Sequence, residues 1–527
     1  MLSLNPETRW AVTFGIIISI AVSILLAAPH SWQPFPRPPF HAPRSMSHDD
    51  IESTLRPLLS PSALIVLPDN DDTAPSFNHL LPHRWSSNPL NSPHPAVVVV
   101  PAMESDIAHT IRYANAHNIP FLVATGGHGT GRWLARMQGG VLIHMRNLTK
   151  FELDPEDGAG TATATLGGGL LVSEVVDRLW AAGKQTPTGL CGCVSVVGPA
   201  LGGGHGILQG QYGLVADQIV SVRLVLGSGE VVVVSGAERV DLFWALRGAG
   251  HNFGVVSELT VRVYDVEEGR REWAYEIFTF KGDRLEELYT LVEKVMRDQP
   301  EHVVHWSVWA RNEAIDPDKP VIVLTIFWNG PVEGRGGYTD PFHALGPASY
   351  SSGATEYPGV MAVMGTDMNS PVCQPQGTVF LRGAVVDTYE TGALRKWYNL
   401  FSEMLRSEEA FAHSFCMLEG YSVQAVQAVP SDSTAFPDRK QRLLFSPAIS
   451  YKAVGNATLD AAAEHWSKAM EAAAFGGLEK TTYVNYAHGD ESLQAMYGYT
   501  PWRLERLRAL KRKYDPGNRF RFFAPLV

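Results

Sequence analysis

The sequence predicts a mixed α+β fold with more than one domain, and three observations lead to this prediction. The chain has 527 residues, which is too long for a single hydrophobic core. Hydrophobic residues make up 45% of it and charged residues 18%, a balance that excludes a disordered chain. From Pro95 onward, short apolar runs bounded by Pro or Gly alternate with amphipathic stretches, as strands alternate with helices.

The first 44 residues are expected to be a targeting segment and a linker. Residues 11–28 are an uncharged apolar run, intermediate in length between a long signal-peptide core and a short spanning helix. Residues 1–28 are therefore expected to be either a cleaved signal peptide or a retained membrane anchor. Residues 29–44 are rich in Pro and are expected to form an extended spacer. Both alternatives direct the chain to the secretory pathway, and glycosylation sequons at Asn147 and Asn456 add weak support.

The first folded domain is expected to span residues 45–266. Strands are predicted where short apolar runs lie between breakers, at residues 96–100, 121–125, 141–145, 161–169, 220–227 and 230–235. A helix capped by Ser105 and Asp106 is predicted before Pro120, and another at residues 173–182. Ser228 and Gly229 separate the last two strands and predict a β-hairpin.

A second domain is expected over residues 267–455, where aromatic-rich strands alternate with helices such as residues 283–297. No internal repeat of fixed period is present. The aromatic side chains there are expected either to line an apolar pocket or to pack the sheet; they are Trp306, Trp309, Phe327 and Trp328.

Composition and missing motifs exclude several classes of function. The net charge of −11, without a run of Lys or Arg, argues against a nucleic-acid partner. Four cysteines are too few for a disulfide scaffold in a chain of this length. No phosphate-binding GxxxxGK[ST], GxSxG, HExxH or complete GxGxxG motif occurs. Cys191 and Cys193 have no second cysteine pair at zinc spacing, so no metal site is expected.

Two glycine-rich segments remain as candidates for binding. Gly126–Gly127–His128–Gly129 follows a predicted strand, and such a turn presents successive backbone N–H groups to a phosphate. Taken alone, it is more simply a turn with a surface histidine. Residues 189–206, GLCGCVSVVGPALGGGHG, have too few side chains to pack a core and suit a backbone that lies flat against a large planar ligand. Cys191 also fits the alternative role of a small buried apolar residue.

Read together, these motifs resemble the berberine bridge enzyme-like branch of the vanillyl-alcohol oxidase superfamily of flavoproteins. The resemblance extends from about Pro95 to Val527 and follows the order of the motifs. These are TGGHG at 125–129, C-x-x-V from Cys191 with LGGGHG downstream, Gly213–Leu214 with Asp217, residues 241–256, YVNY at 483–486 and KYDPGNRF at 513–520. The CGCV and GAGHNFG motifs are most similar to those of tandem enzymes of fungal secondary metabolism.

The resemblance implies an FAD-binding domain of the PCMH type at residues 45–266. It also implies a substrate domain with a helix-covered antiparallel sheet, and a segment, 456–527, that packs back on the FAD domain. His128 matches the histidine that bonds to the flavin 8α carbon, and Cys191 matches the cysteine that bonds to flavin C6. The residues expected to contact FAD are Thr125, Gly126, Gly127, His128, Gly129, Thr130, Cys191, Val194, Ser195, Gly198, Gly202, Gly203, Gly204, His205, Gly206, Asp217, Gly254, Val255, Val256, Asn485 and Tyr486.

This sequence departs from the family pattern in two places. The usual arginine before the GGH turn is Ala124 here, and the glycine after C-x-x-V is Ser195. Cys193 is also close enough in sequence to compete with Cys191 for the second link.

Oxidation by a flavin needs a base for the substrate proton. If YVNY is a strand, Tyr483 and Asn485 share one face, so Tyr483 is expected to be the base and Asn485 to orient the substrate or the flavin. Tyr486 is the alternative base, and a tyrosine that simply packs the core is a further alternative.

In the family, the residue at Val194 lies beside the carbon where dioxygen approaches, and a valine there accompanies oxidases. We therefore expect an FAD-dependent oxidase of a secondary-metabolite intermediate, with a small-molecule substrate and dioxygen as partners. A carbohydrate oxidase and a flavin-retaining protein without turnover are the two alternatives.

Overall fold

The computed structural model describes residues 51, 53–68, 77–81, 86–154, 162–375 and 377–527. The expected targeting segment, residues 1–28, and the Pro-rich linker, residues 29–44, lie outside the described residues. Across the described ranges, no helix combines the length and the apolar character that crossing a membrane requires. The elements below belong to one compact unit.

A four-stranded sheet opens the fold and leads into the first glycine turn. Its order is β1-β2-β4-β3; β2, β4 and β3 are parallel, and β1 is antiparallel to β2. Helix α4 connects β2 to β3 and buries Ile107, Ile111 and Ala114 in a core shared with these strands. Because β3 ends at Ala124, the chain turns at Gly126 and Gly127 at the carboxyl end of this sheet. The elements are β1 (Leu64–Val66), α3 (Phe77–Leu80), β2 (Val97–Val100), α4 (Glu104–Ala116), β3 (Phe121–Ala124) and β4 (Val141–His144).

A five-stranded antiparallel sheet completes the first half, in the order β5-β6-β10-β8-β9. The predicted hairpin is confirmed, because β8 and β9 pair across Ser228 and Gly229, where Gly229 has φ of +82°. The strands are β5 (Phe151–Asp154), β6 (Thr163–Gly167), β8 (Ile219–Leu226), β9 (Val231–Ser235) and β10 (Gly254–Arg262), with the short pair β7 (Lys184–Gln185) and β11 (Tyr264–Asp265) beside them.

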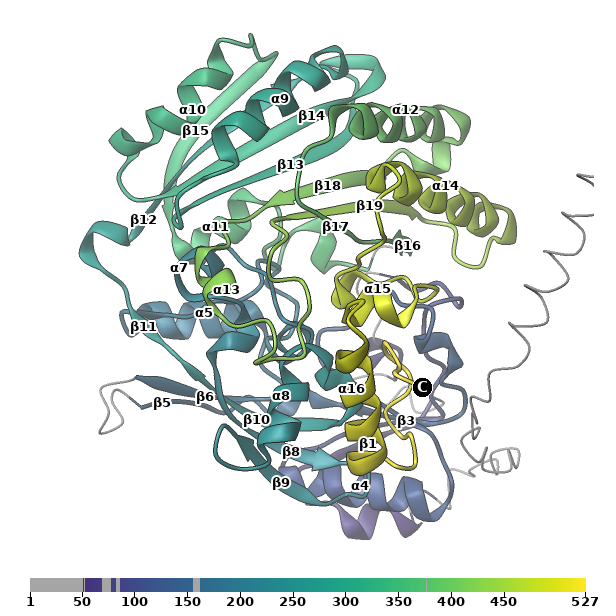
Figure 1. Ribbon diagram of the computed structural model, residues 1–527. Coiled ribbons are helices and arrows are strands. Elements are labelled where there is room, and N and C mark those ends of the chain that lie inside the picture. Colours follow the sequence, from purple (N-terminus) through teal and green to yellow (C-terminus); the bar gives the residue numbers. More distant parts are fainter. Residues whose placement is uncertain (1–50, 52, 69–76, 82–85, 155–161, 376) are drawn as a thin grey trace, which may run out of the picture. The chain divides into compact units, whose positions relative to one another are not determined.

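The second half is built on an eight-stranded antiparallel sheet, in the order β15-β12-β14-β13-β18-β19-β16, with β17 paired to β19. Helices α9, α10, α12 and α14 lie along one face of this sheet, as expected for the substrate domain (Figure 1). The strands are β12 (Glu272–Phe280), β13 (Val303–Asn312), β14 (Asp316–Asn329), β15 (Ser349–Glu356), β16 (Thr378–Leu381), β17 (Ala384–Val386), β18 (Phe415–Gly420) and β19 (Leu443–Tyr451).

The helices divide between the two halves. Those on the large sheet are α9 (Leu285–Met296), α10 (Gly336–His343), α12 (Thr391–Ser407) and α14 (Ala457–Phe475). Besides α3 and α4, the other α-helices in the described ranges are α5 (Val172–Ala181), α6 (Val197–Leu201), α7 (Gln209–Tyr212), α8 (Val240–Ala249), α11 (Tyr357–Val363), α13 (Gln424–Ala428), α15 (Leu493–Tyr497) and α16 (Pro501–Tyr514).

Strand alternation gives the large sheet one face for its helices and one for the FAD half. Cys416 and Leu418 on β18 are fully buried in the core formed with the helices. Met417 and Glu419, on the opposite face of the same strand, line a cavity. On β13, Trp306 pairs with Glu419 and lines the same cavity.

Three local expectations differ from the structure. The helix expected to be capped by Ser105 and Asp106 begins at Glu104, and the Asp106 carboxylate instead accepts N–H bonds from Ala102 and Met103 from within the first turn. The segment expected to return to the FAD domain from residue 456 begins with α14, which packs on α12 and β19, so the return starts after Phe475. YVNY is a 3-10 turn, η11 (Val484–Tyr486), rather than a strand, because the Tyr486 N–H bonds the Tyr483 carbonyl at 2.8 Å.

The returning segment is held by a buried lysine. Lys511 Nζ donates to the carbonyls of Asn252 and Phe520 and to the Asp515 carboxylate, at 2.7–2.9 Å. The side chains of Lys511 and Asp515 are both 1% exposed. This contact fixes residues 520–523, which line the cavity.

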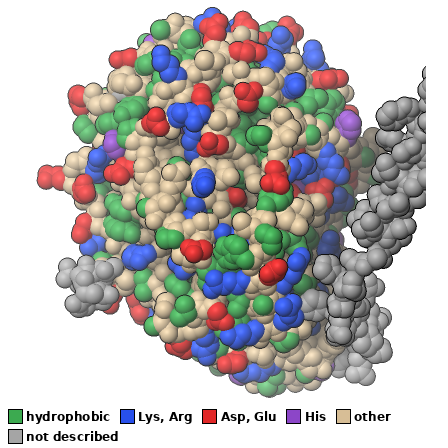
Figure 2. All heavy atoms as spheres, viewed as in Figure 1, with side chains coloured by type: hydrophobic (Ala, Val, Ile, Leu, Met, Phe, Trp, Pro, Cys, Tyr) green, Lys and Arg blue, Asp and Glu red, His purple; other side chains and the backbone are tan. Residues whose placement is uncertain are grey.

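The visible surface mixes acidic and basic side chains without a basic patch (Figure 2).

Replacing Lys511 with Met is expected to lower the free energy of unfolding by about 3–5 kcal/mol, because Asp515 then remains buried without its cation. The control is Lys513→Met, which removes an exposed lysine two positions away that pairs with Asp241. Chemical unfolding of both variants checks the difference. Equal losses in the two variants would show that Lys511 does not pin the segment.

Candidate functional site

A cavity of about 580 Å³ lies where the two halves of the fold face each other. The predicted residues that line it are Thr125, Gly126, Gly127, His128, Gly129, Cys191, Val194, Ser195, Gly198, His205, Gly254, Val255, Val256, Tyr483, Asn485 and Tyr486. Its volume falls within the range of small-molecule and cofactor sites. Motifs that are far apart in the sequence therefore meet in one place.

Six predicted cofactor residues do not line the cavity; they are Thr130, Gly202, Gly203, Gly204, Gly206 and Asp217. The glycines instead allow close packing of protein against protein. A Cβ atom would lie 2.4 Å from Asn485 Oδ1 if placed on Gly202, and 1.9 Å from the Thr188 carbonyl oxygen if placed on Gly206. Gly203 and Gly204, both with positive φ, leave similar room for Phe436 and Val215. These residues shape the wall from behind.

Asp217 joins the two halves of the fold. Its carboxylate forms a two-pronged ion pair with Arg439, at 2.7 and 3.0 Å, and accepts the Leu214 N–H. Both side chains are buried. Arg439 belongs to the loop before β19, so this pair holds a loop of the substrate half against the FAD half.

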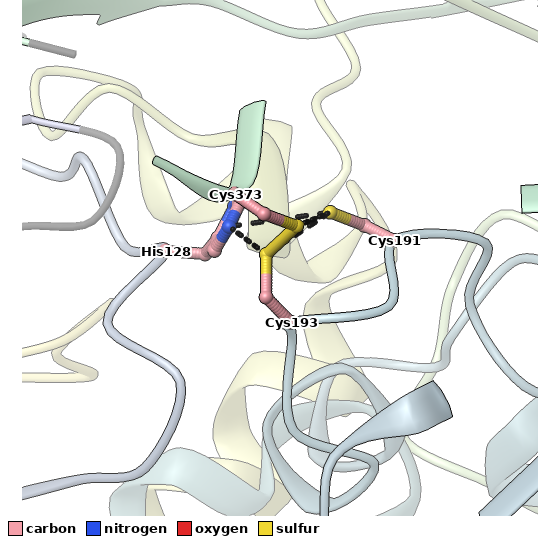
Figure 3. Close-up of side chains that lie close together, drawn as sticks. All are labelled: His128, Cys191, Cys193 and Cys373. Carbon is pink, nitrogen blue, oxygen red and sulfur yellow. Dashed lines mark hydrogen bonds between the residues drawn. A yellow bond between two sulfur atoms is a disulfide. The ribbon is translucent and has the colours of Figure 1, made fainter. Parts of the chain in front are cut away.

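Three cysteines lie close to His128 (Figure 3), and of these Cys191 lines the cavity. Cys193 and Cys373 form a disulfide across 180 residues, which sequence reasoning did not predict. Cys191 keeps its thiol, with Sγ 4.0 Å from His128 Nε2. The four ligand atoms lie within 4.8 Å of one another. Because two of the sulfurs are bonded to each other, the group offers fewer donors than the four of a structural zinc site.

Tyr483 and Asn485 are in contact, although not through a strand face. The Tyr483 oxygen accepts a hydrogen bond from Asn485 Nδ2 at 2.6 Å and another from the Gly204 N–H at 3.1 Å. Burial raises the pKa of Tyr483 to about 12. Asn485 Nδ2 also donates to the Pro199 carbonyl. Both acceptor positions of the Tyr483 phenol are thus occupied by protein groups.

Tyr486 has a different partner, the carboxylate of Glu419. The Tyr486 hydroxyl donates to Glu419 Oε1 at 2.9 Å, and the Tyr421 hydroxyl donates to Oε2 at 2.5 Å. Burial raises the pKa of Glu419 to about 7, against the lowering effect of the two phenols. Burial also raises the pKa of Tyr486 well above its usual value. Tyr486, Glu419 and Tyr421 all line the cavity.

Sequence reasoning missed Glu419 and Tyr421. The available signal was the alternation of FCMLEGY, which sets Glu419 on the face opposite the core residues Cys416 and Leu418. Of the four aromatic residues offered as pocket or packing residues, Trp306 lines the cavity. Trp309 and Phe327 are core residues, and Trp328 packs on His302 and Tyr338.

Two neutral imidazoles complete the wall on the FAD side. Burial lowers the pKa of His205 and of His251 to about 4 each. His205 Nδ1 donates to Gln209 Oε1, and its ring stacks on Tyr421. His251 Nε2 donates to the Gly198 carbonyl at 2.8 Å.

The residues present fit the FAD that the sequence motifs imply. His251 Nδ1 and Trp306 Nε1 are buried without a hydrogen-bond partner in the described protein, and both residues line the cavity. The Gly126–Gly127 turn lets backbone approach a ligand, because Gly127 has φ of +73°. His128 and Cys191 offer an imidazole and a thiol at the same wall.

Comparisons with known proteins also indicate FAD as the cofactor. A family model for the FAD binding domain matches residues 95–235, and a model described as berberine and berberine like matches residues 482–525. The chain is 37% identical over 487 residues to the FAD-linked oxidoreductase chyH of Penicillium rubens, covering 91% of this chain and 94% of that protein.

Two solved structures share the fold at lower identity. The BBE-like 1 protein of Physcomitrella patens is 22% identical, with a TM-score of 0.73, and the match covers 90% of this chain and 99% of that one. The glucooligosaccharide oxidase of Acremonium strictum, which has a 6-S-cysteinyl, 8α-N1-histidyl FAD, is 20% identical, with a TM-score of 0.74 and the same coverage.

Replacing Glu419 with Gln is expected to alter how stability depends on pH. The folded-state pKa of about 7 exceeds the ordinary value of 4.5, so the folded state holds the proton more tightly and loses stability as the pH rises between these values. At 1.36 kcal/mol per pKa unit, this loss is about 3 kcal/mol between pH 4.5 and 7. Unfolding free energies at pH 5 and pH 8 should therefore differ less in Glu419→Gln than in wild type.

The exposed carboxylate Glu409, which pairs with Arg311, provides the control. Glu409→Gln should keep the pH dependence of wild type. The same dependence in Glu419→Gln would contradict a buried, proton-holding carboxylate.

Proposed function

Because the chain belongs to the berberine bridge enzyme-like family of FAD-linked oxidoreductases, we propose that it oxidises an alcohol or carbon centre of a small secondary-metabolite intermediate. The observation that carries the proposal is the Tyr486–Glu419 pair, which places a proton acceptor in the cavity. FAD, when bound, accepts a hydride from the substrate carbon.

Tyr486 serves as the base in this proposal, with Glu419 as its proton acceptor. When the substrate hydroxyl gives its proton to the Tyr486 oxygen, the Tyr486 proton passes to Glu419 Oε1, to which it is already hydrogen-bonded. A carboxyl with a pKa of about 7 suits this role near neutral pH. Tyr483 is less suited, because two N–H donors occupy its oxygen. Its role is to hold Gly204 and Asn485 in place.

The chemistry of the lining supports an apolar metabolite as substrate rather than an oligosaccharide. The side chains that the substrate half contributes are mostly apolar or aromatic: Trp306, Val308, Met364, Val372, Phe415, Met417 and Tyr421. Sugar hydroxyl groups need many polar partners, and this wall supplies few.

We propose that FAD is covalently held by His128 and Cys191. A disulfide sulfur only accepts hydrogen bonds, so the 3.0 Å contact with Cys193 Sγ assigns the ring proton of His128 to Nε2. Nδ1 is then the unprotonated nitrogen that can bond to a carbon. Cys191 supplies the thiol for a second bond.

We further propose that the chain enters the secretory pathway. The apolar run at residues 11–28 and the Cys193–Cys373 disulfide support this, since disulfides persist mainly in oxidising compartments. The sequon residues Asn147 and Asn456 are exposed, although Asn456 also caps α14. Residues 11–28 would anchor the protein in the membrane if they are retained.

The decisive experiment follows flavin reduction without oxygen, using candidate metabolites and oligosaccharides in parallel. Tyr486→Phe is expected to slow this reduction by ~10²-fold or more, because it removes the base. In wild type the rate of flavin reduction should rise with pH through about 7, as Glu419 ionises. In Glu419→Gln this rise with pH should be absent. Tyr483→Phe is the matched control, with a smaller effect.

A Tyr483→Phe variant that is slower than Tyr486→Phe would return the role of base to Tyr483. If oligosaccharides reduce the flavin and the candidate metabolites do not, the result would favour the carbohydrate oxidase.

Dioxygen is the proposed electron acceptor, and Val194 is proposed to leave it room. Val194 lines the cavity beside Cys191. Val194→Leu adds a methylene to a packed wall and is expected to slow reoxidation of the reduced enzyme by air, while reduction by substrate changes little. Val197→Leu makes the same change at another cavity residue and serves as the control. Rapid mixing with oxygenated buffer measures both rates; an equal effect of the two changes would contradict a specific gate.

A further inference from the structure

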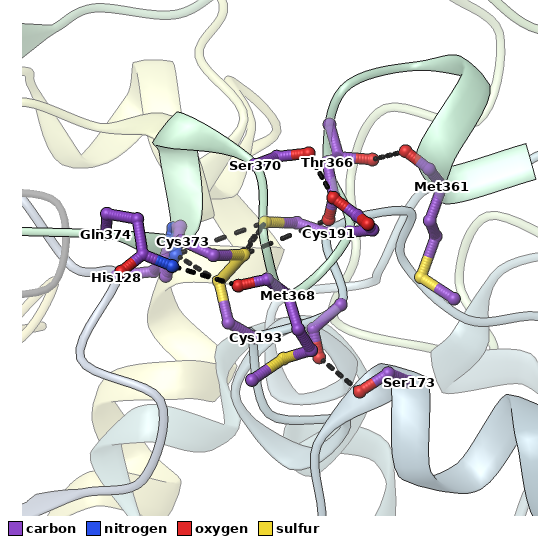
Figure 4. The surroundings of a disulfide bond; sticks show 12 residues. His128, Ser173, Cys191, Cys193, Met361, Thr366, Met368, Ser370, Cys373 and Gln374 are labelled. Atoms are coloured by element: carbon purple, nitrogen blue, oxygen red, sulfur yellow. Dashed lines mark hydrogen bonds between the residues drawn. A yellow bond between two sulfur atoms is a disulfide. The ribbon is translucent and has the colours of Figure 1, made fainter.

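The Cys193–Cys373 disulfide joins the FAD half to the substrate half at the cavity wall (Figure 4). Cys373 ends the short turn η9 (Pro371–Cys373), and Cys193 lies in the glycine-rich segment that carries Cys191. Backbone contacts run alongside the bond, since the Gly192 N–H donates to the Thr366 carbonyl at 2.8 Å. The Thr366 hydroxyl donates to the Leu190 carbonyl.

The Cys191 sulfur lies to the side of this disulfide bond, at equal distances from its two sulfurs. Its Sγ is 3.7 Å from Cys193 Sγ and also 3.7 Å from Cys373 Sγ. Thiol–disulfide exchange requires the attacking sulfur to approach one sulfur along the S–S axis, in line with the one that leaves. A thiol that is equally distant from both sulfurs lies to the side of the bond. The geometry therefore keeps Cys191 as a thiol beside a disulfide that it does not attack.

The two cysteines of the CxC pair thus differ in reactivity although they are two residues apart. Cys193 is fully buried and bonded, whereas Cys191 is partly exposed and lines the cavity. Only a sulfur that can become a thiolate is a nucleophile. In the absence of the disulfide, two further thiols would stand 3.7 Å from the Cys191 sulfur.

We propose that the Cys193–Cys373 disulfide selects Cys191 as the cysteine that bonds to the flavin, by withdrawing both neighbouring sulfurs from the reaction. This inference rests on the covalent FAD of the proposed function. In the linking reaction one sulfur–carbon bond forms, the thiol hydrogen and one ring hydrogen leave, and the two electrons reduce dioxygen to hydrogen peroxide.

The first test uses the wild-type protein. The native holoprotein is denatured without reductant, alkylated with iodoacetamide and digested, and its peptides are sequenced by mass spectrometry. The expected result is a cross-linked Cys193–Cys373 peptide in which Cys191 of the same peptide is bonded to the flavin, and the flavin in turn to the His128 peptide. Alkylation of Cys193 and Cys373, or flavin mass on Cys193, overturns the inference.

The second test compares variants. In Cys373→Ser the Cys193 thiol is released, and the flavin mass is expected to shift from Cys191 alone to both cysteines. The double variant with Cys193→Ser and Cys373→Ser should restore attachment at Cys191 alone, which separates the loss of selection from damage to the fold. Cys416→Ala changes a buried cysteine in β18, outside the cluster, and should keep attachment at Cys191 alone.

Failure of the two proposals can be told apart. Flavin that stays on Cys191 alone in Cys373→Ser overturns selection by the disulfide but leaves the oxidoreductase intact. Wild-type protein that loses all its flavin on acid precipitation overturns both the covalent link and this inference, and substrate-driven flavin reduction then tests the proposed function separately.

Discussion

The site depends on how closely three other segments of the chain approach the backbone at Gly202, Gly203 and Gly204. Side chains from the C-terminal turn, the loop before β19 and the turn after α7 occupy the space where Cβ atoms would stand. Each contact is too short for a residue with a Cβ atom. The three segments can therefore pack here only because residues 202–204 are glycines. The Tyr483 hydroxyl accepts a hydrogen bond from the Gly204 N–H. This bond fixes the turn from which the Tyr486 hydroxyl donates to Glu419.

The rest of the wall follows from this junction. The ion pair between Asp217 and Arg439 holds the loop that carries Phe436, and the Cys193–Cys373 disulfide holds the opposite side of the cavity. Between them, Glu419 is removed from water, and burial rather than a charged neighbour is the largest cause of its raised pKa. The packing that closes the cavity thus also adjusts the chemistry inside it.

Much of this arrangement could be predicted from the sequence, because local patterns carry it. The strands β2, β3, β4, β6, β8 and β9, the helices α4 and α5, the β8–β9 hairpin and the convergence of His128 and Cys191 follow from periodicity and ordered motifs. The partner of Cys193 could not be predicted, since Cys373 lies 180 residues away with no local signal. Glu419 was missed for a similar reason: its raised pKa and its contact with Tyr486 exist only in the assembled cavity. Asp217, which was expected to contact the cofactor, instead pairs with Arg439, a residue distant in sequence.

The pinning of residues 520–523 by Lys511 has a consequence for biogenesis. These residues complete a wall whose other side, the turn at Gly126 to His128, is synthesised almost four hundred residues earlier. A nascent chain whose synthesis has not reached Phe520 lacks this part of the cavity wall. A truncated polypeptide that stops before Phe520 therefore carries the glycine motifs without residues 520–523 to complete the cavity wall.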